Sequence, residues 1–375
     1  MNPQLIFEQA VPVTKPKLPK YANYTETIKG IWNRRWLTND GPLHQEFKTK
    51  LERTLKVPFA ELFTNGHLAL EIAIKSLGLK GEVITTPFTF ASTIHAISNC
   101  GLTPVFCDID RETLNIDPDE IEKHITSETS AIAAVHVFGT PCNVYKIEKI
   151  AQKHGLKVIY DAAHAFGVEL DGKGIGNFGD ISMFSLHATK VFHSIEGGLL
   201  TFSDDSFSPK LKALKNFGIT SPESVDYIGT NAKMNEFQAA MGLCNLEELQ
   251  ADIAAREAAY QAYVSVFQEM DSVRFLQGYS NIKANYSYFP VLFESKNVRD
   301  QMFEILKKYN VLARKYFYPL CNDFSCYNAD SSNTPVAKEV SDSVLCLPMF
   351  SDLGDVKARQ IAEIINYELG DKIGG

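Results

Sequence analysis

Between about residue 58 and residue 202, short apolar runs alternate with helical stretches, and this alternation constrains the fold more than any other feature of the sequence. The runs lie at 82–88, 103–109, 131–139, 157–163, 181–186 and 197–202. They are apolar without polar alternation, which is typical of strands buried on both faces. We therefore predict an α/β fold with helices on both sides of a mostly parallel sheet. Ligands of such sheets bind where the strands end.

The rest of the chain predicts a smaller lobe that a long helix joins to the first. Residues 235–270 contain no proline and are rich in Ala, Leu, Glu and Gln, as a long helix requires. A strand-like run at 286–294 and helical stretches at 298–310 and 355–369 indicate an α+β lobe, which the N-terminal segment is a candidate to complete. The predicted boundaries are 1–245 for the large domain, with the N-terminal segment counted in it, and 246–375 for the small domain.

Charge and cysteine content exclude several classes of protein. The chain has 37 Lys and Arg against 45 Asp and Glu, a formal charge of −8, whereas nucleic-acid binding needs a surplus of basic residues. Its seven cysteines form no CxxC pair, so we predict neither a disulfide framework nor a zinc site. The sequence shows no uninterrupted run of eighteen apolar residues, and its first residues lack an apolar core followed by a small-residue cleavage site, so we expect neither a membrane span nor a signal peptide. We expect a cytoplasmic protein that binds neither nucleic acid nor membrane.

The stretch at 62–78 is a candidate anion site. Thr64 and Asn65 are residue types that cap helices, and Gly66 allows close approach of a ligand. The helix that follows is apolar except at positions four apart, so its beginning should be buried against the sheet, with free N–H groups for a phosphate. Taken alone, the stretch fits an ordinary capped core helix better.

Two other patterns in this region suggest a ligand less strongly. The glycine-rich run at 171–180 leads into a strand, whereas a dinucleotide fingerprint must leave a strand and open a helix, so we interpret it as a turn. The spacing of His164, His187 and His193 matches no helical pair of metal ligands. We therefore predict no metal site.

Asp161 and Lys190 are the candidates for chemistry. Asp161 ends an apolar run, where a parallel strand would deliver its carboxylate into a ligand crevice; the alternative is a cap for the next turn. Lys190 stands among uncharged neighbours at 185–195, which favours a role in chemistry. The alternative is an ordinary lysine whose ammonium is solvated at the surface. Pyridoxal phosphate requires a phosphate site, an anion at its ring nitrogen and an amine for its Schiff base. These surroundings would lower the pKa of Lys190 and make it a nucleophile and a base.

The sequence resembles the PLP-dependent sugar-nucleotide aminotransferases, which have the aspartate aminotransferase fold. The resemblance runs nearly end to end, and its motifs are "WLTNDGPLHQEF", "TNGHLAL", "EVITTPFTFAST", "YDAAHAFG", "FGDISMFSLHATKVFHSIEGG", "GTNAKMNEFQAAMGL" and "VLCLPMF". It implies the fold type I of PLP enzymes, with a seven-stranded type of sheet. It also implies a homodimer whose two active sites lie at the subunit interface.

The same resemblance assigns roles to individual residues. Lys190 would form the Schiff base and carry the proton, and Asp161 would hold the ring nitrogen. Phe90 matches the ring that stacks on the cofactor, and His164 stands where the family commonly has glutamine. The positions that match phosphate contacts are Gly66, His67, Ser185 and, from the partner subunit, Asn231. His67 replaces the usual threonine, so a backbone N–H is expected to make that contact.

The implied reaction moves the amino group of L-glutamate, through pyridoxamine phosphate, to a keto sugar linked to a nucleoside diphosphate. The motifs are most similar to those of enzymes that make dTDP-4-amino-4,6-dideoxyglucose, and enzymes that make 3-amino-3,6-dideoxyhexoses are the alternative. Such sugars usually enter cell-surface polysaccharides such as the O-antigen of lipopolysaccharide. The candidates for sugar-nucleotide contacts are His187, Lys233, Tyr316 and Tyr318.

Two other classes of function are disfavoured. A non-catalytic regulator with the same fold would not need Lys190, Asp161 and Ser185 together. A Rossmann-type sugar epimerase would carry the dinucleotide fingerprint that the chain lacks.

Overall fold

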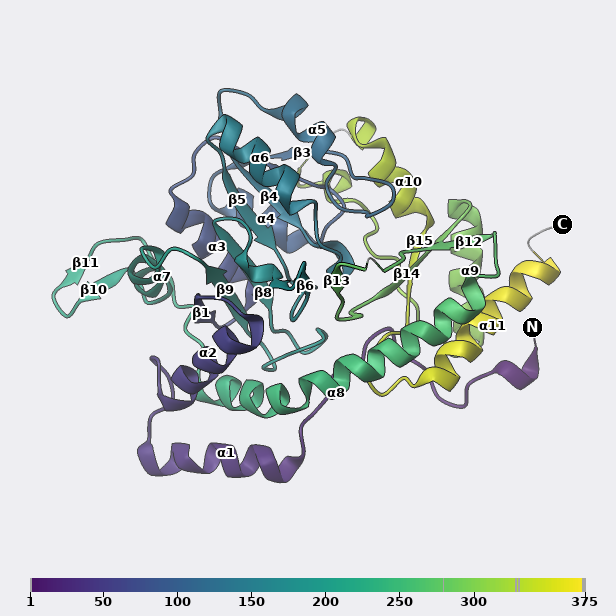
Figure 1. Cartoon of the computed structure of the whole chain (residues 1–375), viewed down its shortest axis with the longest axis horizontal. Helices are drawn as coiled ribbons and strands as arrows, with labels where there is room; N and C mark the ends of the chain where they lie inside the picture. The colour runs from purple at the N-terminus through teal and green to yellow at the C-terminus, as the bar shows by residue number, and fades with distance from the viewer. Residues whose placement is uncertain (1, 279, 328, 330, 373–375) are drawn as a thin grey trace.

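The computed structural model describes residues 2–278, 280–327, 329 and 331–372. It has a large lobe built around a sheet and a smaller lobe beside it, and one long helix, α8, runs beneath both (Figure 1). Within the described residues, no helix is long and apolar enough to cross a bilayer.

The large lobe is organised by a seven-stranded sheet of described residues in the order β1-β9-β8-β5-β4-β2-β3. Strands β2, β3, β4, β5 and β8 are parallel, while β9 runs antiparallel to both of its neighbours. The bounds are β1 Phe59–Phe63, β2 Glu82–Thr85, β3 Thr103–Phe106, β4 Thr129–Val135, β5 Lys157–Asp161, β8 Ile181–Ser185 and β9 Gly198–Phe202. The predicted α/β class and mostly parallel sheet are confirmed.

Helices cover both faces of this sheet because successive strand residues point to opposite sides. In β4, Ala131 and Ala133 join the core under α3, α4 and α7, whereas Ile132 and Ala134 join the core under α2, α6 and the start of α8. The helix bounds are α1 Tyr21–Arg34, α2 Pro42–Leu55, α3 Gly66–Leu77, α4 Ala91–Asn99, α5 Pro118–Ile121, α6 Val144–His154 and α7 Phe207–Lys215. Asn65 caps α3 as its residue type predicts, and Gly155 ends α6 in a left-handed conformation.

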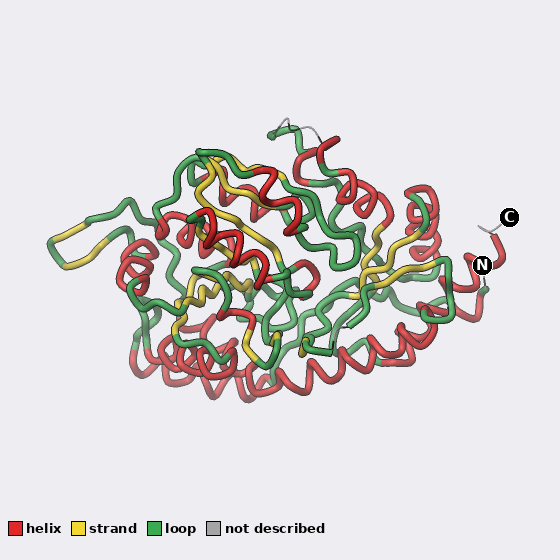
Figure 2. The backbone as a smooth tube through the Cα atoms, turned by 45° about the horizontal axis from the view of Figure 1, so that its top comes forward, coloured by secondary structure: helices red, strands yellow, loops and turns green. Residues whose placement is uncertain are grey.

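Short ribbons and single turns fill the loops. Strand β6 pairs with β7 and β13, and β10 pairs with β11 in a hairpin that projects from the large lobe (Figure 2). Their bounds are β6 Glu169–Leu170, β7 Lys173–Gly174, β13 Ile282–Lys283, β10 Ile219–Ser221 and β11 Ser224–Val225. The 3-10 turns are η1 Pro3–Leu5, η2 Glu122–His124, η3 Val137–Gly139, η4 Ile175–Asn177, η5 Cys321–Asp323 and η6 Ser331–Asn333.

The small lobe is an antiparallel sheet, β12-β14-β15, packed against helices. Its elements are β12 Val273–Phe275, β14 Phe289–Phe293, β15 Val344–Leu347, α9 Lys296–Lys308, α10 Pro335–Ser343 and α11 Asp355–Lys372. Phe7 and Val11 are buried in the core of this lobe, and Val11 forms a bridge with Val311. The first residues of the chain therefore pack in the small lobe, whereas α1 and α2, which follow them, pack on the core of the large lobe. The predicted domain boundaries stay a prediction.

Helix α8, Glu236–Phe267, links the two lobes and is the predicted long helix at 235–270. Asn235 caps it, and the side chain of Gln238 closes the capping box. The Gln238 amide also donates to the carbonyl of Thr64 at 3.2 Å and to that of Glu196 at 2.8 Å. The first turn of α8 is thereby tied to the start of α3 and to the loop that follows Lys190.

Candidate functional site

A cavity of about 360 Å³ lies where β4, β5 and β8 end, and residues of both lobes line it. The predicted site residues on its wall are Gly66, His67, Phe90, Asp161, His164, Ser185, His187, Lys190 and Tyr316. The convergence of these residues agrees with the rule that ligands of such sheets bind beyond the carboxyl ends of parallel strands.

Asp161 is the last residue of β5 and is almost fully buried. Its carboxylate accepts hydrogen bonds from Thr93 Oγ1 at 2.7 Å and from the N–H of Ala163 at 3.0 Å. Burial raises the pKa of Asp161, and these two donors act in the opposite direction. A cation placed beside Asp161 would offset the cost of burying its charge.

Lys190 lies in the turn after β8, on the cavity wall. Its ammonium forms no hydrogen bond or ion pair with any residue in the described ranges. Desolvation lowers the pKa of Lys190 to about 8; Asp161 opposes this effect and Arg314 adds to it. About a tenth of the amine is therefore unprotonated at pH 7, far more than of an ordinary lysine, and this is the state needed of a nucleophile or a base.

The beginning of α3 forms a cradle beside Lys190. The Asn65 side chain accepts from the N–H of Leu68 at 2.9 Å, and the first-turn N–H groups have no intrahelical acceptor. A β-carbon at Gly66 would lie 3.2 Å from Met183 Sδ and 3.3 Å from the Ser185 Cα. Glycine thus lets the beginning of α3 pack closely on the end of β8, and the helix terminus favours a negatively charged group.

His67 adds side-chain contacts at the same end of α3. Its Nδ1 lies 2.9 Å from Ser92 Oγ and its Nε2 lies 3.1 Å from Glu71 Oε1. The ring is therefore held next to the cradle by two elements, α4 and α3 itself.

Aromatic rings form another part of the wall of the 360 Å³ cavity. His164 is buried, its Nδ1 accepts from the N–H of Phe138 at 3.2 Å, and its ring lies parallel to that of Phe317 at 5.9 Å. Burial keeps the pKa of His164 well below its usual value, so this imidazole is neutral. Phe90 is the N-cap residue of α4 and is 50% exposed, with its ring on the cavity wall, where it can contact a flat ligand.

Three predicted residues lie outside the cavity. Lys233 Nζ donates to Asn231 Oδ1 at 2.8 Å and lies 4.6 Å from the ring of Phe217. Tyr318 faces the guanidinium of Arg299 at 4.7 Å. Asn231 and Lys233 therefore do not line the cavity of their own chain. Their contact with the cofactor and the substrate of a second subunit stays a prediction.

The sequence analysis missed Thr93, Tyr288 and Arg314. Thr93 bonds to Asp161, and Tyr288 and Arg314 line the cavity from the small lobe. Arg314 could have been inferred from Tyr316, since residues two apart in an extended segment point to the same side. Thr93 and Tyr288 carried no comparable signal, because their contacts with Asp161 and His164 depend on the tertiary fold.

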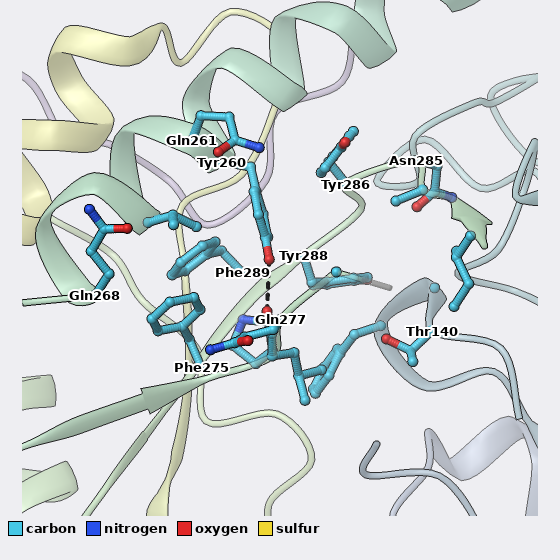
Figure 3. A pocket seen from close by; sticks show the side chains of 18 residues that line it. Thr140, Tyr260, Gln261, Gln268, Phe275, Gln277, Asn285, Tyr286, Tyr288 and Phe289 are labelled. Atoms are coloured by element: carbon cyan, nitrogen blue, oxygen red, sulfur yellow. Dashed lines mark hydrogen bonds between the residues drawn. The ribbon is translucent and has the colours of Figure 1, made fainter. Parts of the chain in front are cut away.

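A second cavity, of about 490 Å³, lies beyond Tyr288 (Figure 3). Aromatic and amide side chains from α8 and the small lobe line it, and the Tyr260 hydroxyl donates to the carbonyl of Leu276 at 2.7 Å. None of its described lining residues carries a charge. Tyr288 is the residue that lines both cavities.

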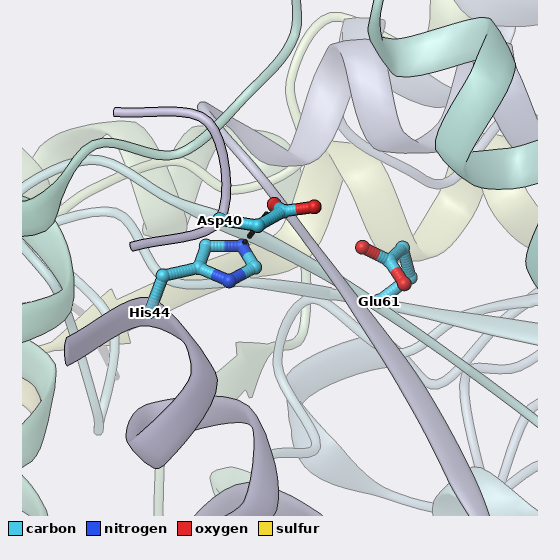
Figure 4. A group of neighbouring side chains, drawn as sticks. All are labelled: Asp40, His44 and Glu61. Atoms are coloured by element: carbon cyan, nitrogen blue, oxygen red, sulfur yellow. Dashed lines mark ion pairs between the residues drawn. The ribbon is translucent and has the colours of Figure 1, made fainter. Parts of the chain in front are cut away.

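A largely buried cluster of titratable side chains lies where β1, the end of α7 and the beginning of α2 meet. Asp40, His44 and Glu61 face one another with their ligand atoms within 4.8 Å, a geometry that the sequence analysis did not predict (Figure 4). Lys215, which is 1% exposed, donates to Asp40 at 3.0 Å and also to Glu61. An ammonium thus already supplies the positive charge of this cluster, which we call the Lys215 cluster.

Comparison with known proteins agrees with the geometry of the cavity. Residues 20–366 match the model of the DegT/DnrJ/EryC1/StrS aminotransferase family. The chain belongs to this family. It is a PLP-dependent sugar aminotransferase, as the resemblance implied.

Two relatives are named dTDP-4-amino-4,6-dideoxy-D-glucose transaminase. The one from Escherichia coli is 42% identical over 96% of this chain and 98% of its own length. The one from Shigella dysenteriae is 43% identical over 92% and 95%. Among solved structures, DesI in the presence of its TDP-sugar product matches with a TM-score of 0.93 and 34% identity, over 98% of this chain and 94% of that one.

The cavity residues fit pyridoxal phosphate. Gly66 and His67, whose N–H groups have no intrahelical acceptor at the beginning of α3, line the cavity, and a phosphate can bind there. The buried carboxylate of Asp161 suits a protonated ring nitrogen, and the unpaired amine of Lys190 suits an aldehyde. The donor set, an anion, an amine and a helix terminus, is the set that the sequence predicted.

Proposed function

We propose that the protein transfers the amino group of L-glutamate to carbon 4 of a dTDP-linked 4-keto-6-deoxyhexose. The products are 2-oxoglutarate and the dTDP-linked 4-amino-4,6-dideoxyhexose, so the amino group and two electrons leave glutamate and enter the sugar. The unpaired Lys190 amine beside Asp161 carries the assignment to transamination. The names of the 42% and 43% identical relatives support the choice of sugar and carbon.

In the proposed mechanism, bound pyridoxal phosphate supplies an aldehyde and an electron-accepting ring. Asp161 holds a proton on the ring nitrogen, and Thr93 keeps the carboxylate in place. Lys190 Nζ moves a proton at the substrate carbon that carries the nitrogen, first on the amino donor and then on the sugar. Gly66, His67, Ser185, Phe90 and His164 line the cavity. The N–H groups of Gly66 and His67, with Ser185, would hold the phosphate, and Phe90 and His164 would confine the ring.

The proposal includes a homodimer in the cytoplasm. Asn231 and Lys233 lie beside Phe217, which is 52% exposed, near the projecting β10–β11 hairpin. In this arrangement Asn231 would reach the partner's phosphate site and Lys233 would reach the partner's sugar nucleotide.

His187 and Tyr316 are the proposed sugar contacts from the same chain. Tyr318 lies outside the cavity, so it would support Tyr316 and would not contact the sugar itself. The amino sugar would serve a cell-surface polysaccharide such as O-antigen.

Amination at carbon 3 is the alternative. A relative from Acidithiobacillus ferrooxidans named UDP-N-acetyl-3-dehydro-alpha-D-glucosamine 3-aminotransferase is 33% identical over 81% of this chain. Its identity is lower than that of the two 4-amino relatives, so we favour carbon 4.

A direct experiment tests the function. The purified protein should bind pyridoxal phosphate and be yellow, and L-glutamate should bleach the colour. Incubation with glutamate and 4-keto or 3-keto dTDP-6-deoxyhexose, followed by NMR of the product, would locate the new amine. Borohydride reduction should label the peptide that contains Lys190. A colourless protein that is indifferent to pyridoxal phosphate would support a non-catalytic regulator and overturn the proposal.

A further inference from the structure

Glu196 brings a second carboxylate, besides that of Asp161, to the wall of the cavity that holds Lys190. Its backbone carbonyl accepts hydrogen bonds from the side-chain amide of Gln238 at 2.8 Å and from Ser194 Oγ at 2.9 Å. Its side chain is half exposed. The backbone of Glu196 is thus fixed to α8, while its carboxylate is open to a ligand in the cavity.

The carboxylate of Glu196 has one hydrogen-bond donor beside it in the described ranges, the imidazole of His187. The Nε2 of His187 lies 3.4 Å from Glu196 Oε1. The Nδ1 of the same ring accepts from the N–H of Thr189 at 3.2 Å, so a neutral His187 carries its proton on Nε2, on the side of Glu196. A carboxylate can accept about four hydrogen bonds. Glu196 therefore has acceptor positions left for a ligand.

The two carboxylates of the cavity differ in what they can bind. Asp161 is almost fully buried and accepts from Thr93 and Ala163, and the proposed mechanism uses it for the ring nitrogen of the cofactor. Glu196 would repel the cofactor phosphate, the carboxylates of the amino donor and the diphosphate of the sugar nucleotide, because all of these groups are anions. The ligand group that Glu196 takes must therefore be a hydrogen-bond donor.

Few donors of the two substrates come near the reacting carbon. The amino group of glutamate must reach the cofactor aldehyde at Lys190, so the reaction itself engages it. The donors of the nucleoside are separated from the hexose by the diphosphate, whereas Glu196 follows Lys190 by six positions and lines the same cavity. The hydroxyl groups on carbons 2 and 3 of the hexose are the donors that remain.

We propose that Glu196 accepts a hydrogen bond from the hydroxyl group on carbon 3 of the sugar. This hydroxyl is next to carbon 4, which receives the amino group. The other neighbour of carbon 4 is carbon 5, whose methyl group forms no hydrogen bond with a carboxylate. The contact therefore favours the orientation in which the carbon 3 edge of the ring faces Glu196, and it positions carbon 4 for Lys190. This inference rests on the proposed function, since it assumes a 4-keto-6-deoxyhexose.

The inference predicts which reactions depend on Glu196. Glutamate carries no hydroxyl group, so Glu196 should serve the half-reaction with the sugar and not the half-reaction with the amino donor. A residue that only maintained the shape of the cavity, or only held His187, would affect every sugar alike, with or without a hydroxyl group on carbon 3.

The test compares two sugar nucleotides in single turnovers of the holoenzyme, after L-glutamate has aminated the cofactor. They are dTDP-4-keto-6-deoxyglucose and its 3-deoxy analogue, and the recovery of the cofactor absorbance gives kcat/KM for each. The wild-type protein should prefer the sugar with the hydroxyl group about 10-fold. This is the low end for a hydrogen bond to a charged group, because Glu196 is half exposed.

Substitution of Glu196 should remove this preference. E196A should lower kcat/KM about 10-fold for the sugar with the hydroxyl group and leave the 3-deoxy sugar unchanged, so the two losses are not additive. E196D, which keeps a carboxylate on a shorter side chain, should recover part of the loss. Bleaching by L-glutamate should be unchanged in both variants. E363A, which removes an exposed glutamate of α11, is the matched control.

A 2-deoxy analogue tests the same point on the unaltered protein and does not depend on how a variant folds. The wild-type protein should use this analogue as well as dTDP-4-keto-6-deoxyglucose, because its hydroxyl group on carbon 3 is retained.

Four results would overturn the inference. They are equal use of the parent and 3-deoxy sugars by the wild type, discrimination against the 2-deoxy sugar in place of the 3-deoxy sugar, equal losses of E196A on the parent and 3-deoxy sugars, and an equal loss of E196A with L-glutamate. A wild-type protein that is not bleached by L-glutamate and aminates no keto sugar would instead contradict the proposed function.

Discussion

Lys190 and Lys215 stand 25 positions apart in the same lobe and illustrate two uses of a desolvated lysine. Desolvation lowers the pKa of Lys190 to about 8. Burial would also lower the pKa of Lys215, but Glu61 and Asp40 together raise it. The difference lies in the partners, because Lys215 contacts two carboxylates and Lys190 faces a cavity. A paired lysine stabilises the fold, whereas an unpaired one costs stability and is available for chemistry.

The largest expected difference between the two lysines is in catalysis. K190A should reduce transamination by about 10⁴-fold or more, because it removes both the nucleophile and the proton carrier. Single-turnover absorbance measurements with glutamate would give the rate. A K190A protein that retained a tenth of the wild-type rate would remove Lys190 from the mechanism.

Protein stability should be lost with Lys215 and not with Lys190, the reverse of the expectation for catalysis. K215M should lower the free energy of unfolding by about 3–5 kcal/mol, because it removes the nearest cation from the buried Glu61, which keeps only Lys48 at 3.4 Å, and from the partly exposed Asp40. Urea unfolding followed by circular dichroism would measure the change. The double variant K215M/E61Q should recover part of the loss, since one of the unpaired charges is then absent. If K215M is as stable as the wild type, the Lys215 cluster contributes no net stability.

K190M should instead stabilise the cofactor-free protein, by about 2 kcal/mol at pH 7 once partial exposure to the cavity is taken into account. The sign follows from the lowered pKa: below pH 8 the folded protein bears the cost of a charged Lys190. That cost declines as the pH rises from 8 toward 10.5, so the gain from K190M should decline over the same range. Urea unfolding at pH 7 and pH 10 would show this, and a gain that does not depend on pH would contradict the pKa argument.

The smallest expected effect is on cofactor affinity, and it concerns Asp161, the carboxylate beside Lys190. T93V removes the hydroxyl that donates to Asp161, which should raise the pKa of this carboxyl group further. A hydrogen bond to a charged group contributes about 1.5–3 kcal/mol, so the affinity for pyridoxal phosphate should fall about tenfold. Equilibrium dialysis would measure it, with T27V in α1 as the control. Unchanged affinity would mean that Thr93 does not support the cofactor site.

The parts of the fold that depend on local pattern were predictable from sequence. The apolar run that ends at Asp161 indicated a buried strand, and strand ends are where α/β proteins bind ligands. Lys190 was identified because uncharged residues surround it in the sequence. Both signals are present within a dozen neighbouring residues.

The parts that depend on contacts between distant segments were not predictable. Val11 pairs with Val311 across 300 positions, and nothing in the short apolar stretch around Val11 indicates which core it joins. The partners of Lys215 lie more than 150 positions away, so a lysine that contacts two carboxylates looked like any surface lysine. Arg314 reaches the cavity only because β15 positions its backbone.

The 32 residues of α8 form an uninterrupted rod about 48 Å long. One end of this rod holds, through Gln238, the carbonyl groups of Thr64 and Glu196, while the other end is packed against α11 of the small lobe. Lys190 belongs to the lobe at one end of this rod and Arg314 to the lobe at the other, and both line the cavity between them. A tilt of one lobe on this rod would therefore change the width of the cavity that the two lobes share.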